Sequence, residues 1–249
     1  MEKIISYPLS LVAMLLFLIT LLVFHPIQWI CLNVFGYQAH KKSVDYLNFF
    51  LVRIAHILGT RFQIENRQLL PKGVPLIFVA NHQSLYDIIG LIWFMRRFHP
   101  KFVSKKELAK GIPSVSFNLR HGGSVVIDRK DPKQAIPEIK KLGEYIEKHH
   151  RTAVIFPEGT RSKTGVPKEF AQSGLKILCK YAPSAYVVPI SINNSWKFVK
   201  YGFFPFGLGN RIIFTLHEPI PVKDHSFEEL MQATENTIKN AINEAQSMR

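Results

Sequence analysis

The first forty residues of this chain constrain its fold most strongly, because residues 4–40 contain no Asp, Glu, Lys or Arg. Within them the stretch Pro8–Phe24 is apolar enough for a membrane helix, which needs about 20 residues, with a range of roughly 17–25. His25 and Pro26 interrupt this stretch, and a second apolar run, Ile27–Phe35, follows. The pattern predicts either a single tilted span or a helical hairpin that enters and leaves the same face of a membrane.

A cleaved signal peptide fits this segment less well, since the apolar region is too long and no small-x-small cleavage site follows it. Lys41, Lys42 and Arg53 follow the apolar region, which favours a cytoplasmic location for the main part of the chain. We therefore expect membrane-associated helices in residues 1–59 and a main domain in residues 60–249.

The charge of the chain is unbalanced, with 32 Lys and Arg against 18 Asp and Glu and a formal net charge of +14. Such a surface attracts anions, which include nucleic acid, anionic lipid head groups and phosphorylated substrates. Because the N-terminal segment predicts a membrane location, we favour phospholipids and expect no nucleic acid. Cys31 and Cys179 make no disulfide framework, which fits a reducing compartment. No zinc-type spacing, P-loop or GxGxxG sequence is present, so we expect neither a metal nor a bound cofactor.

Beyond the apolar segment, residues 43–59 have the pattern of an amphipathic helix ending at Gly59. Short β-rich runs then alternate with helical ones. The expected strands are Arg61–Glu65, Pro75–Ala80, Lys101–Ser104, Ser124–Ile127, Thr152–Phe156, Tyr186–Ile192 and Arg211–Leu216. The expected helices are Tyr86–Met95, Pro132–His150, Ala171–Tyr181 and Phe227–Met248. This alternation predicts an α/β fold in which helices cover a sheet, without determining the order of the strands.

His82 and Asp87 lie just after the expected strand Pro75–Ala80. In a continuous α-helix five residues give about 500° of rotation, so the two side chains would lie roughly 140° apart. They can meet only if His82 lies at or before the helix N-terminus and Asp87 lies in its first turns. An aspartate bonded to one imidazole nitrogen leaves the other free to take a proton from a substrate hydroxyl. Polar residues at a helix start are also ordinary caps, so this pair alone does not establish catalysis.

Two basic residues follow other expected strands. Arg129 lies after the strand that ends at Ile127, where it either clamps an anion or forms a surface ion pair with Asp128 or Asp131. Lys105 follows the strand Lys101–Ser104, where it is either a solvated lysine or a contact to a phosphate.

The run Phe156–Ser162 (FPEGTRS) also begins where a strand is expected to end. Gly159 allows a ligand to approach the backbone closely, Thr160 offers a hydroxyl, and Arg161 offers a planar fork suited to a phosphate. Because Glu158 is negative, we expect it to orient an arginine or bond a hydroxyl rather than touch a phosphate. The alternative is a polar turn with an ordinary ion pair.

Taken in order, four patterns resemble the four motifs of the glycerolipid acyltransferases, and most nearly those of the 1-acyl-sn-glycerol-3-phosphate acyltransferase branch. They are Asn81-His82-x4-Asp87, Gly123…Asp128-Arg129, Phe156–Ser162 and Val188-Pro189-Ile190. The resemblance implies a glycerol-3-phosphate acyltransferase-type domain, with a mixed sheet flanked by helices, on an N-terminal helical membrane anchor. It also implies transfer of a fatty acyl group from acyl-CoA or acyl carrier protein to the sn-2 hydroxyl of lysophosphatidate, giving phosphatidate.

In this interpretation His82 is the general base and Asp87 orients its ring. The predicted substrate-binding residues are Lys105, Arg129, Glu158, Gly159, Thr160 and Arg161. Two alternatives remain open at this point. One is an O-acyltransferase that acts on another acceptor, such as a lyso-ornithine lipid, a lyso-glycine lipid or a lysophospholipid. The other is a non-catalytic membrane lipid-binding protein with the same fold.

The loop Tyr201–Gly209 contains three phenylalanines among glycines and a proline. We expect these rings to be buried in the core, and a loop that dips into the membrane or grips an acyl chain is the alternative.

Overall fold

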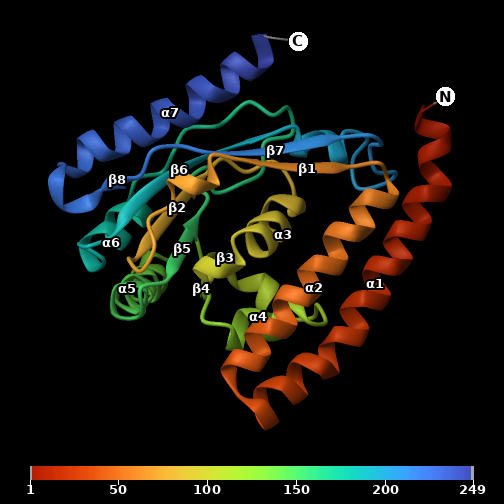
Figure 1. The fold of residues 1–249 in the computed structure, drawn as a ribbon, viewed down its shortest axis with the longest axis horizontal. Coiled ribbons are helices and arrows are strands. Elements are labelled where there is room, and N and C mark those ends of the chain that lie inside the picture. The colour runs from red at the N-terminus through yellow and green to blue at the C-terminus, as the bar shows by residue number, and fades with distance from the viewer. Residues whose placement is uncertain (1, 248–249) are drawn as a thin grey trace.

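In the computed structural model, which describes residues 2–247, helices cover both faces of one sheet (Figure 1). The α-helices are α1 (Glu2–Phe35), α2 (Tyr37–Ile57), α3 (Leu85–Phe94), α4 (Val115–His121), α5 (Pro132–His149), α6 (Ser173–Tyr181) and α7 (Phe227–Ser247). Short 3-10 helices occupy Arg67–Leu69, Arg96–Phe98, Lys106–Ala109, Ser195–Val199 and Val222–Asp224. The strands are β1 (Arg61–Glu65), β2 (Leu76–Ala80), β3 (Pro100–Lys105), β4 (Val125–Ile127), β5 (Thr152–Ile155), β6 (Tyr186–Asn193), β7 (Arg211–Leu216) and β8 (Ile220–Pro221).

Within the described residues the sheet is mixed and has the strand order β1-β7-β6-β2-β5-β3-β4, with β8 paired to β6. The five strands from β6 to β4 in this order are parallel to one another, whereas β7 is antiparallel to β6. The predicted α/β fold with a mixed sheet flanked by helices is therefore confirmed. Because the five parallel strands share a direction, their carboxyl ends meet at one edge of the sheet, where α/β proteins commonly bind ligands.

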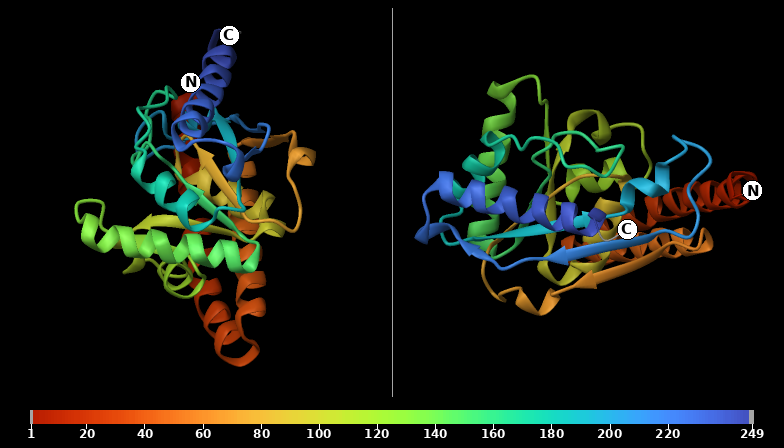
Figure 2. Two further views of the ribbon diagram at one scale, coloured as in Figure 1. Left: turned by 90° about the vertical axis from the view of Figure 1, so that its left-hand side faces the viewer. Right: turned by 90° about the horizontal axis from the view of Figure 1, so that it is seen from above.

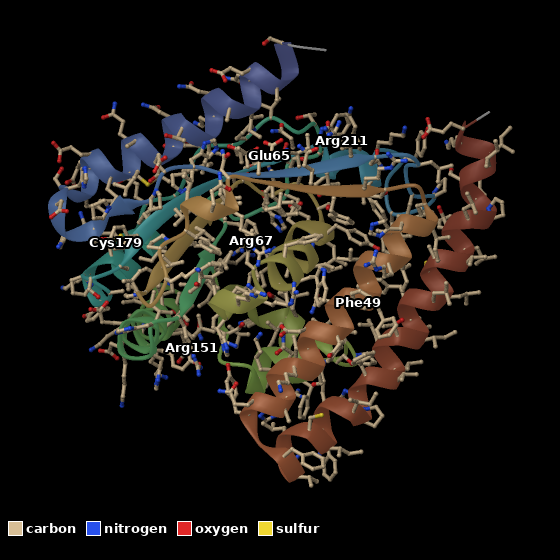
Figure 3. The ribbon with its side chains drawn as sticks, in the orientation of Figure 1. Phe49, Glu65, Arg67, Arg151, Cys179 and Arg211 are labelled. Carbon is tan, nitrogen blue, oxygen red and sulfur yellow. The ribbon has the colours of Figure 1, made fainter. Side chains whose placement is uncertain are left out.

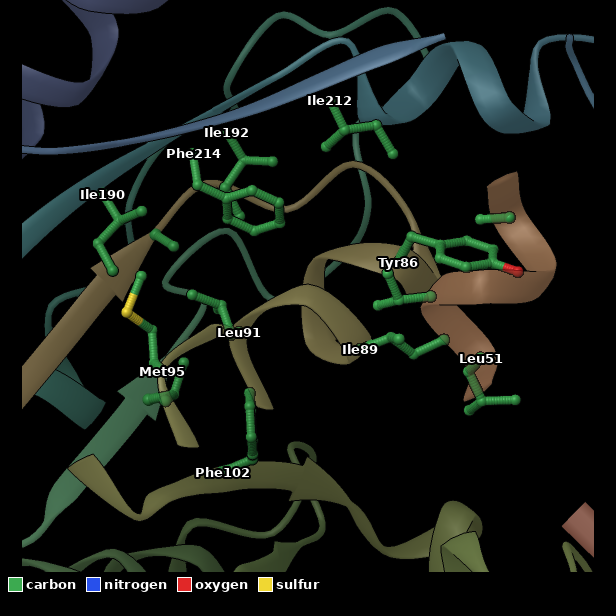
Figure 4. Close-up of a cluster of buried hydrophobic side chains, with 14 of the residues drawn as sticks. Leu51, Tyr86, Ile89, Leu91, Met95, Phe102, Ile190, Ile192, Ile212 and Phe214 are labelled. Atoms are coloured by element: carbon green, nitrogen blue, oxygen red, sulfur yellow. The ribbon is translucent and has the colours of Figure 1, made fainter. Parts of the chain in front are cut away.

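The central strand β2 shows why both faces of the sheet need a cover. All five of its side chains are buried, and they alternate between two hydrophobic clusters. Phe78 belongs to the cluster beneath α2 and α3, together with Leu51, Leu91 and Phe214 (Figure 4). Ile77 belongs to the opposite cluster, which α5, α6 and α7 cover. The sheet is thus the middle of three layers, which fixes the position of the loops at its edges.

The helix α1 runs without a break through His25 and Pro26, so the two apolar runs of the sequence form one continuous helix and not a hairpin folded at that point. Pro26 has no N–H, and the Leu22 carbonyl four residues earlier therefore loses its helical partner. Next to this point Ser114 donates its Oγ hydrogen to the Leu21 carbonyl at 2.6 Å and its backbone N–H to His25 Nδ1 at 3.1 Å. The sheet with its covering helices and loops is called the αβ layers below. Hydrogen bonds from these layers therefore stabilise α1 where the proline weakens it.

The helices α1 and α2 lie antiparallel along one side of the molecule and form a hairpin (Figures 1 and 2). Within residues 2–247, α1 is the one helix long and apolar enough to cross a membrane, with a mean hydropathy of 2.5 over its most apolar window. Its 34 residues extend about 51 Å, whereas the hydrocarbon core of a bilayer is about 30 Å thick. By length and composition α1 fits the membrane-associated segment that the sequence predicted.

Both helices of the hairpin pack against the αβ layers. Near the start of α1, Glu2 forms an ion pair with Lys200 at 2.7 Å. On α2, Phe49, labelled in Figure 3, packs its ring against Trp93 of α3 with 5.0 Å between ring centroids. Since the hairpin shares a hydrophobic cluster with the sheet, the division into residues 1–59 and 60–249 stays a prediction.

Most predicted boundaries agree with the observed ones to within two residues, and β1 and β7 match at both ends. The helix predicted from residue 43 begins six residues earlier, at Tyr37, after Gly36 in a positive-φ conformation. The helix α4 was missed because its pattern is too short to show a period. The predicted end of the last helix at Met248 lies outside the described residues.

In the loop Tyr201–Gly209, two of the three phenylalanine rings pack against the protein, as expected, and the third is exposed. Phe206 packs against the main hydrophobic cluster, and Phe204 meets Tyr7 of α1 with 5.5 Å between ring centroids. Phe203 is 84% exposed, so the prediction of burial is wrong for this residue.

Candidate active site

The loop between β2 and α3 is shaped by the start of the helix. Ser84 is the N-cap and its hydroxyl accepts a hydrogen bond from the backbone N–H of Tyr86. Asp87, at the third helical position, accepts hydrogen bonds through Oδ2 from the backbone N–H groups of Gln83 at 2.6 Å and Ser84 at 2.8 Å. This capping box holds the Asp87 carboxylate against the loop that precedes the helix.

His82 lies in that loop, before the helix N-terminus, and meets Asp87 as the geometry required. Its Nδ1 is 2.8 Å from Asp87 Oδ2, and the Asp87 side chain is fully buried. A carboxylate only accepts hydrogen bonds, so Nδ1 carries the hydrogen and Nε2 is the acceptor. The imidazole also stacks on Phe156, with 4.2 Å between ring centroids and 18° between planes. The ring is therefore held in one orientation, with Nε2 at the exposed end.

Arg161 is the contact at that exposed end. Its Nε donates to His82 Nε2 at 3.4 Å, which is long for a hydrogen bond. A hydroxyl at this position would make a shorter bond to the same nitrogen. The geometry is that of a general base whose acceptor atom faces an exchangeable donor.

The backbone of His82 is held from both sides by the run Phe156–Ser162. Its N–H donates to Glu158 Oε1 at 2.7 Å, and its carbonyl accepts from the Ser162 N–H at 2.7 Å. Glu158 Oε2 accepts from the Lys168 backbone N–H at 2.8 Å. We expected Glu158 to orient an arginine or bond a hydroxyl. In the structure its two oxygens hold backbone amides, and a bond from Glu158 to a hydroxyl of the substrate stays a prediction. Burial raises the pKa of Glu158, and the two N–H groups act in the opposite direction.

A hollow of about 420 Å³ opens in front of His82, at the carboxyl edge of the sheet. It brings together residues from the ends of β2, β3 and β5 and from the loop after β4. Its lining includes five of the six predicted substrate-binding residues, namely Lys105, Arg129, Gly159, Thr160 and Arg161. Glu158 lies behind the catalytic loop rather than in this lining.

Arg129 does not form the surface ion pair that was the alternative for it. Asp128 binds Lys106, and Asp131 caps α5 by accepting a hydrogen bond from the Lys133 backbone N–H at 3.0 Å. Burial lowers the pKa of Arg129, and Glu107 acts in the opposite direction. The guanidinium therefore faces the hollow with donors available to an anion.

A second hollow, about 550 Å³ in volume, adjoins the first and shares Arg129, Phe156 and Gly159 with it. It lies between α5 and α6 and its lining is mainly apolar, with Ile127, Ile136, Ile139, Ile155 and Ile177 among its residues. The candidate site thus joins a cationic cleft to an apolar one, an arrangement suited to a ligand with a charged head and a hydrocarbon chain.

Sequence reasoning assigned no role to several residues that position the loop. Asn81 bonds both backbone groups of Ile192, donating to the carbonyl at 2.9 Å and accepting from the N–H at 2.7 Å. Gln83 donates to the Gly165 carbonyl and accepts from the Trp196 N–H. Their polar side chains beside His82 were the available signal, but their partners lie more than 80 residues away.

The comparisons with known proteins agree with this geometry. A family model described as acyltransferase matches residues 61–193, which is more than half of the chain. The chain belongs to the acyltransferase family. A crystal structure of the 1-acyl-sn-glycerophosphate acyltransferase PlsC from Thermotoga maritima has the same fold, with a TM-score of 0.82 and 26% identity. That match covers 99% of this chain and 98% of the other.

Two curated relatives within this acyltransferase family carry the same activity in their names. A 1-acyl-sn-glycerol-3-phosphate acyltransferase from Helicobacter pylori is 37% identical over 131 residues, which is 49% of this chain and 52% of that protein. A chloroplastic one from Arabidopsis thaliana is 30% identical over 161 residues, 64% of this chain and 44% of that protein. The aligned parts therefore span about half the length of these curated relatives.

Proposed function

We propose that this acyltransferase moves a fatty acyl group from an acyl thioester to the sn-2 hydroxyl of lysophosphatidate, giving phosphatidate. The observation that carries the proposal is the 2.8 Å bond from His82 to the buried Asp87 at the mouth of a cationic hollow. The names of the relatives supply the acceptor, and the charge of the hollow agrees with a phosphate.

In the proposed reaction the acceptor hydroxyl replaces Arg161 at His82 Nε2 and gives its proton to this nitrogen as its oxygen attacks the thioester carbonyl. Asp87 stabilises the imidazolium that forms. The carbon–sulfur bond then breaks, the leaving thiolate takes the proton from Nε2, and the ester remains on the glycerol. No acyl-enzyme and no further co-reactant are needed.

The cations of the hollow are proposed to hold the phosphate of the acceptor. Arg129 and Arg161 offer planar forks that can bind phosphate oxygens in pairs, and Lys105 adds a point charge. Gly159 and Thr160 would contact the glycerol and its oxygens. Fixing the acceptor and the donor in line supplies much of the rate in such reactions.

The adjoining apolar hollow is proposed to hold the acyl chain of the donor, either acyl-CoA or acyl carrier protein. The hairpin is proposed to enter and leave the same face of the membrane, with the αβ layers on the cytoplasmic side. Two contacts support the hairpin arrangement: α1 bonds the αβ layers through Glu2 and again at Leu21, so both ends of its most apolar stretch are held against the same layers. The exposed Phe203 and the outer face of α1 would then contact lipid.

The proposed activity is tested by thioester release with the full chain in detergent, with lysophosphatidate as the acceptor. His82→Ala should reduce turnover roughly 10²–10⁴-fold, because that is the typical contribution of a general base. His149→Ala, an exposed histidine on α5, is the matched control and should retain full activity. Near-normal turnover by His82→Ala would reject the mechanism.

The same assay separates the alternatives that the sequence left open. Each purified acceptor, from lysophosphatidate to lyso-ornithine and lyso-glycine lipids, is offered with acyl-CoA and, in parallel, with acyl carrier protein that carries an acyl thioester. The proposal expects the highest kcat/KM with lysophosphatidate. Thioester consumption that required a different acceptor would replace the proposed substrate, and none with any acceptor would support a non-catalytic lipid-binding protein.

A further inference from the structure

A second cationic hollow lies at the opposite edge of the sheet from the catalytic cleft. It is about 280 Å³ in volume and opens between the first turns of α2 and the segment that leads into the amino end of β3. Four cations line it, and Asp45 is the carboxylate among its described lining residues. The cations are Lys41, Lys42, Arg96 and Arg97.

An inner chamber of about 30 Å³ adjoins this hollow and shares Lys41, Asp45 and His99 with it. His40 also lines the chamber; it is 0% exposed, and neither of its ring nitrogens has a hydrogen-bond partner among the described residues. Lys101, 6% exposed, lines the chamber as well. Buried polar groups are nearly always hydrogen-bonded, so an unpartnered imidazole in a polar chamber indicates a place for a further polar group.

The positive charge of this region exceeds what its carboxylate neutralises. Asp45 is already bound by Lys41, which also donates to the Arg96 carbonyl at 2.7 Å. Burial lowers the pKa of Arg67, labelled in Figure 3, and the nearby Arg96 and Arg97 lower it further. Arginines that destabilise one another's charge form a field that attracts an anion.

The pKa of a neighbouring histidine is lowered by the same positive electrostatic field. Burial lowers the pKa of His99 to about 4, and Lys41, Lys101 and Arg151 act in the same direction. Histidines that stay neutral beside several cations offer hydrogen-bond donors without adding charge. The lysines and arginines therefore determine that the ligand is an anion.

We propose that these adjoining hollows form a second phosphate-binding site, distinct from the catalytic cleft, which binds the phosphate of an anionic phospholipid head group. The lipid source follows from the surface around it. Lys42 lies on the same exposed face of α2 as Tyr46 and Phe50, at spacings of four and eight residues, so the cation and two exposed rings point the same way. A head group bound here would fix the membrane hairpin against the αβ layers.

The proposal is tested by flotation of the full chain with vesicles, using the double variant Lys42→Gln with Arg97→Gln. Both residues are exposed, so neither substitution disturbs the packing of the hydrophobic core. The matched control is Lys148→Gln with Lys180→Gln, which removes the same charge from exposed positions on α5 and α6. Vesicles contain either phosphatidylcholine alone or phosphatidylcholine and phosphatidylglycerol in equal parts. We expect the double variant to bind the anionic vesicles roughly tenfold more weakly than the control variant does.

A second arm measures thermal stabilisation by inorganic phosphate, with Arg129→Gln and Arg161→Gln added to every protein so that the catalytic cleft does not contribute. Loss of stabilisation in the Lys42/Arg97 variant alone, with no difference on vesicles, would support the site but assign it to free phosphate. Equal behaviour of the variant and its control in both arms would overturn the proposal. Equal loss of binding to neutral vesicles would also overturn it, since the residues would then act on the hairpin and not on a phosphate.

Discussion

Two histidines at opposite edges of one sheet have cations close by, yet their surroundings differ in the two respects that matter for chemistry. His82 at the carboxyl edge has a carboxylate at 2.8 Å and an open hollow in front of Nε2. His40, near the amino end of β3, is fully buried and unpartnered among the described residues. Burial lowers the pKa of His40 to about 4, and Lys101 and His121 act in the same direction.

A histidine among cations is suited to act as a base only where a neighbouring negative group stabilises its protonated form. Asp87 does this for His82, because an imidazolium beside a buried carboxylate is stabilised as it forms. His40 has cations and apolar rings around it, and its protonated form is therefore disfavoured. The same side chain is suited to proton transfer at one edge and to a neutral hydrogen-bonding role at the other.

Asp87→Asn would remove the difference most directly, by making His82 resemble His40. We expect kcat to fall roughly 10²-fold, since the imidazolium loses its compensating negative charge and the amide keeps only one oxygen that can accept hydrogen bonds. The control is Asp131→Asn, because Asp131 also caps a helix but lies outside the cleft. Because Asn caps a helix about as well as Asp, a similar loss of activity in both variants would show that the loss does not come from the charge beside His82.

Arg129→Gln asks whether the cations of the carboxyl edge bind the acceptor phosphate. We expect the KM for lysophosphatidate to rise roughly 30-fold, because hydrogen bonds to charged groups contribute about 1.5–3 kcal/mol. Activity toward a monoacylglycerol, which lacks the phosphate, should not change. Lys130→Gln, the exposed neighbour, is the control, and an unaltered KM in Arg129→Gln would remove this residue from the phosphate site.

Glu158→Gln tests whether turnover depends on the hydrogen bond by which Glu158 fixes the backbone of His82. An amide can accept only one of the two backbone N–H bonds through its oxygen, so the loop loosens. We expect kcat to fall roughly tenfold with little change in the acceptor KM, because small misplacements of a base reduce rate rather than binding. Glu169→Gln, exposed in the same loop, should behave as the parent. A rise in KM with kcat intact would return Glu158 to the substrate-binding set.

His40→Phe tests whether the histidine at the amino edge of the sheet stays neutral in the folded protein. Because the folded pKa of His40 is about 4 and the unfolded value is about 6.5, the unfolded chain binds the proton first as the pH falls. The stability conferred by the neutral ring is present above the unfolded pKa and is lost as the pH falls toward the folded one.

The variant should therefore lose less stability than the parent between about pH 7 and about pH 5, by on the order of 1 kcal/mol, measured by urea unfolding. His99 has a pKa lowered in the same way, so part of the pH dependence should remain. An identical pH dependence in parent and variant would show that His40 titrates normally.

The elements of the fold were predictable because strong local patterns determine them. The continuous apolar run of β2 and the amphipathic period of α5 can be recognised without knowledge of their partners, and their bounds were predicted to within a residue or two. The helix α4 is too short to show a period. The sequence left open whether residues 8–35 form one helix or two, and Ser114 supports the single helix across nearly ninety residues of sequence. Contacts of that separation leave no local pattern.

Local sequence was sufficient to predict that His82 and Asp87 could meet only across a helix start, and that residues 4–40 would favour an apolar environment. Both follow from the geometry and solvation of neighbouring residues. By contrast, the packing of distant segments places Glu158 against the backbone of His82, and His40 among cations at the opposite edge of the sheet. These depend on which strands become neighbours, because a side chain's partners and its solvation are fixed only when distant segments pack together.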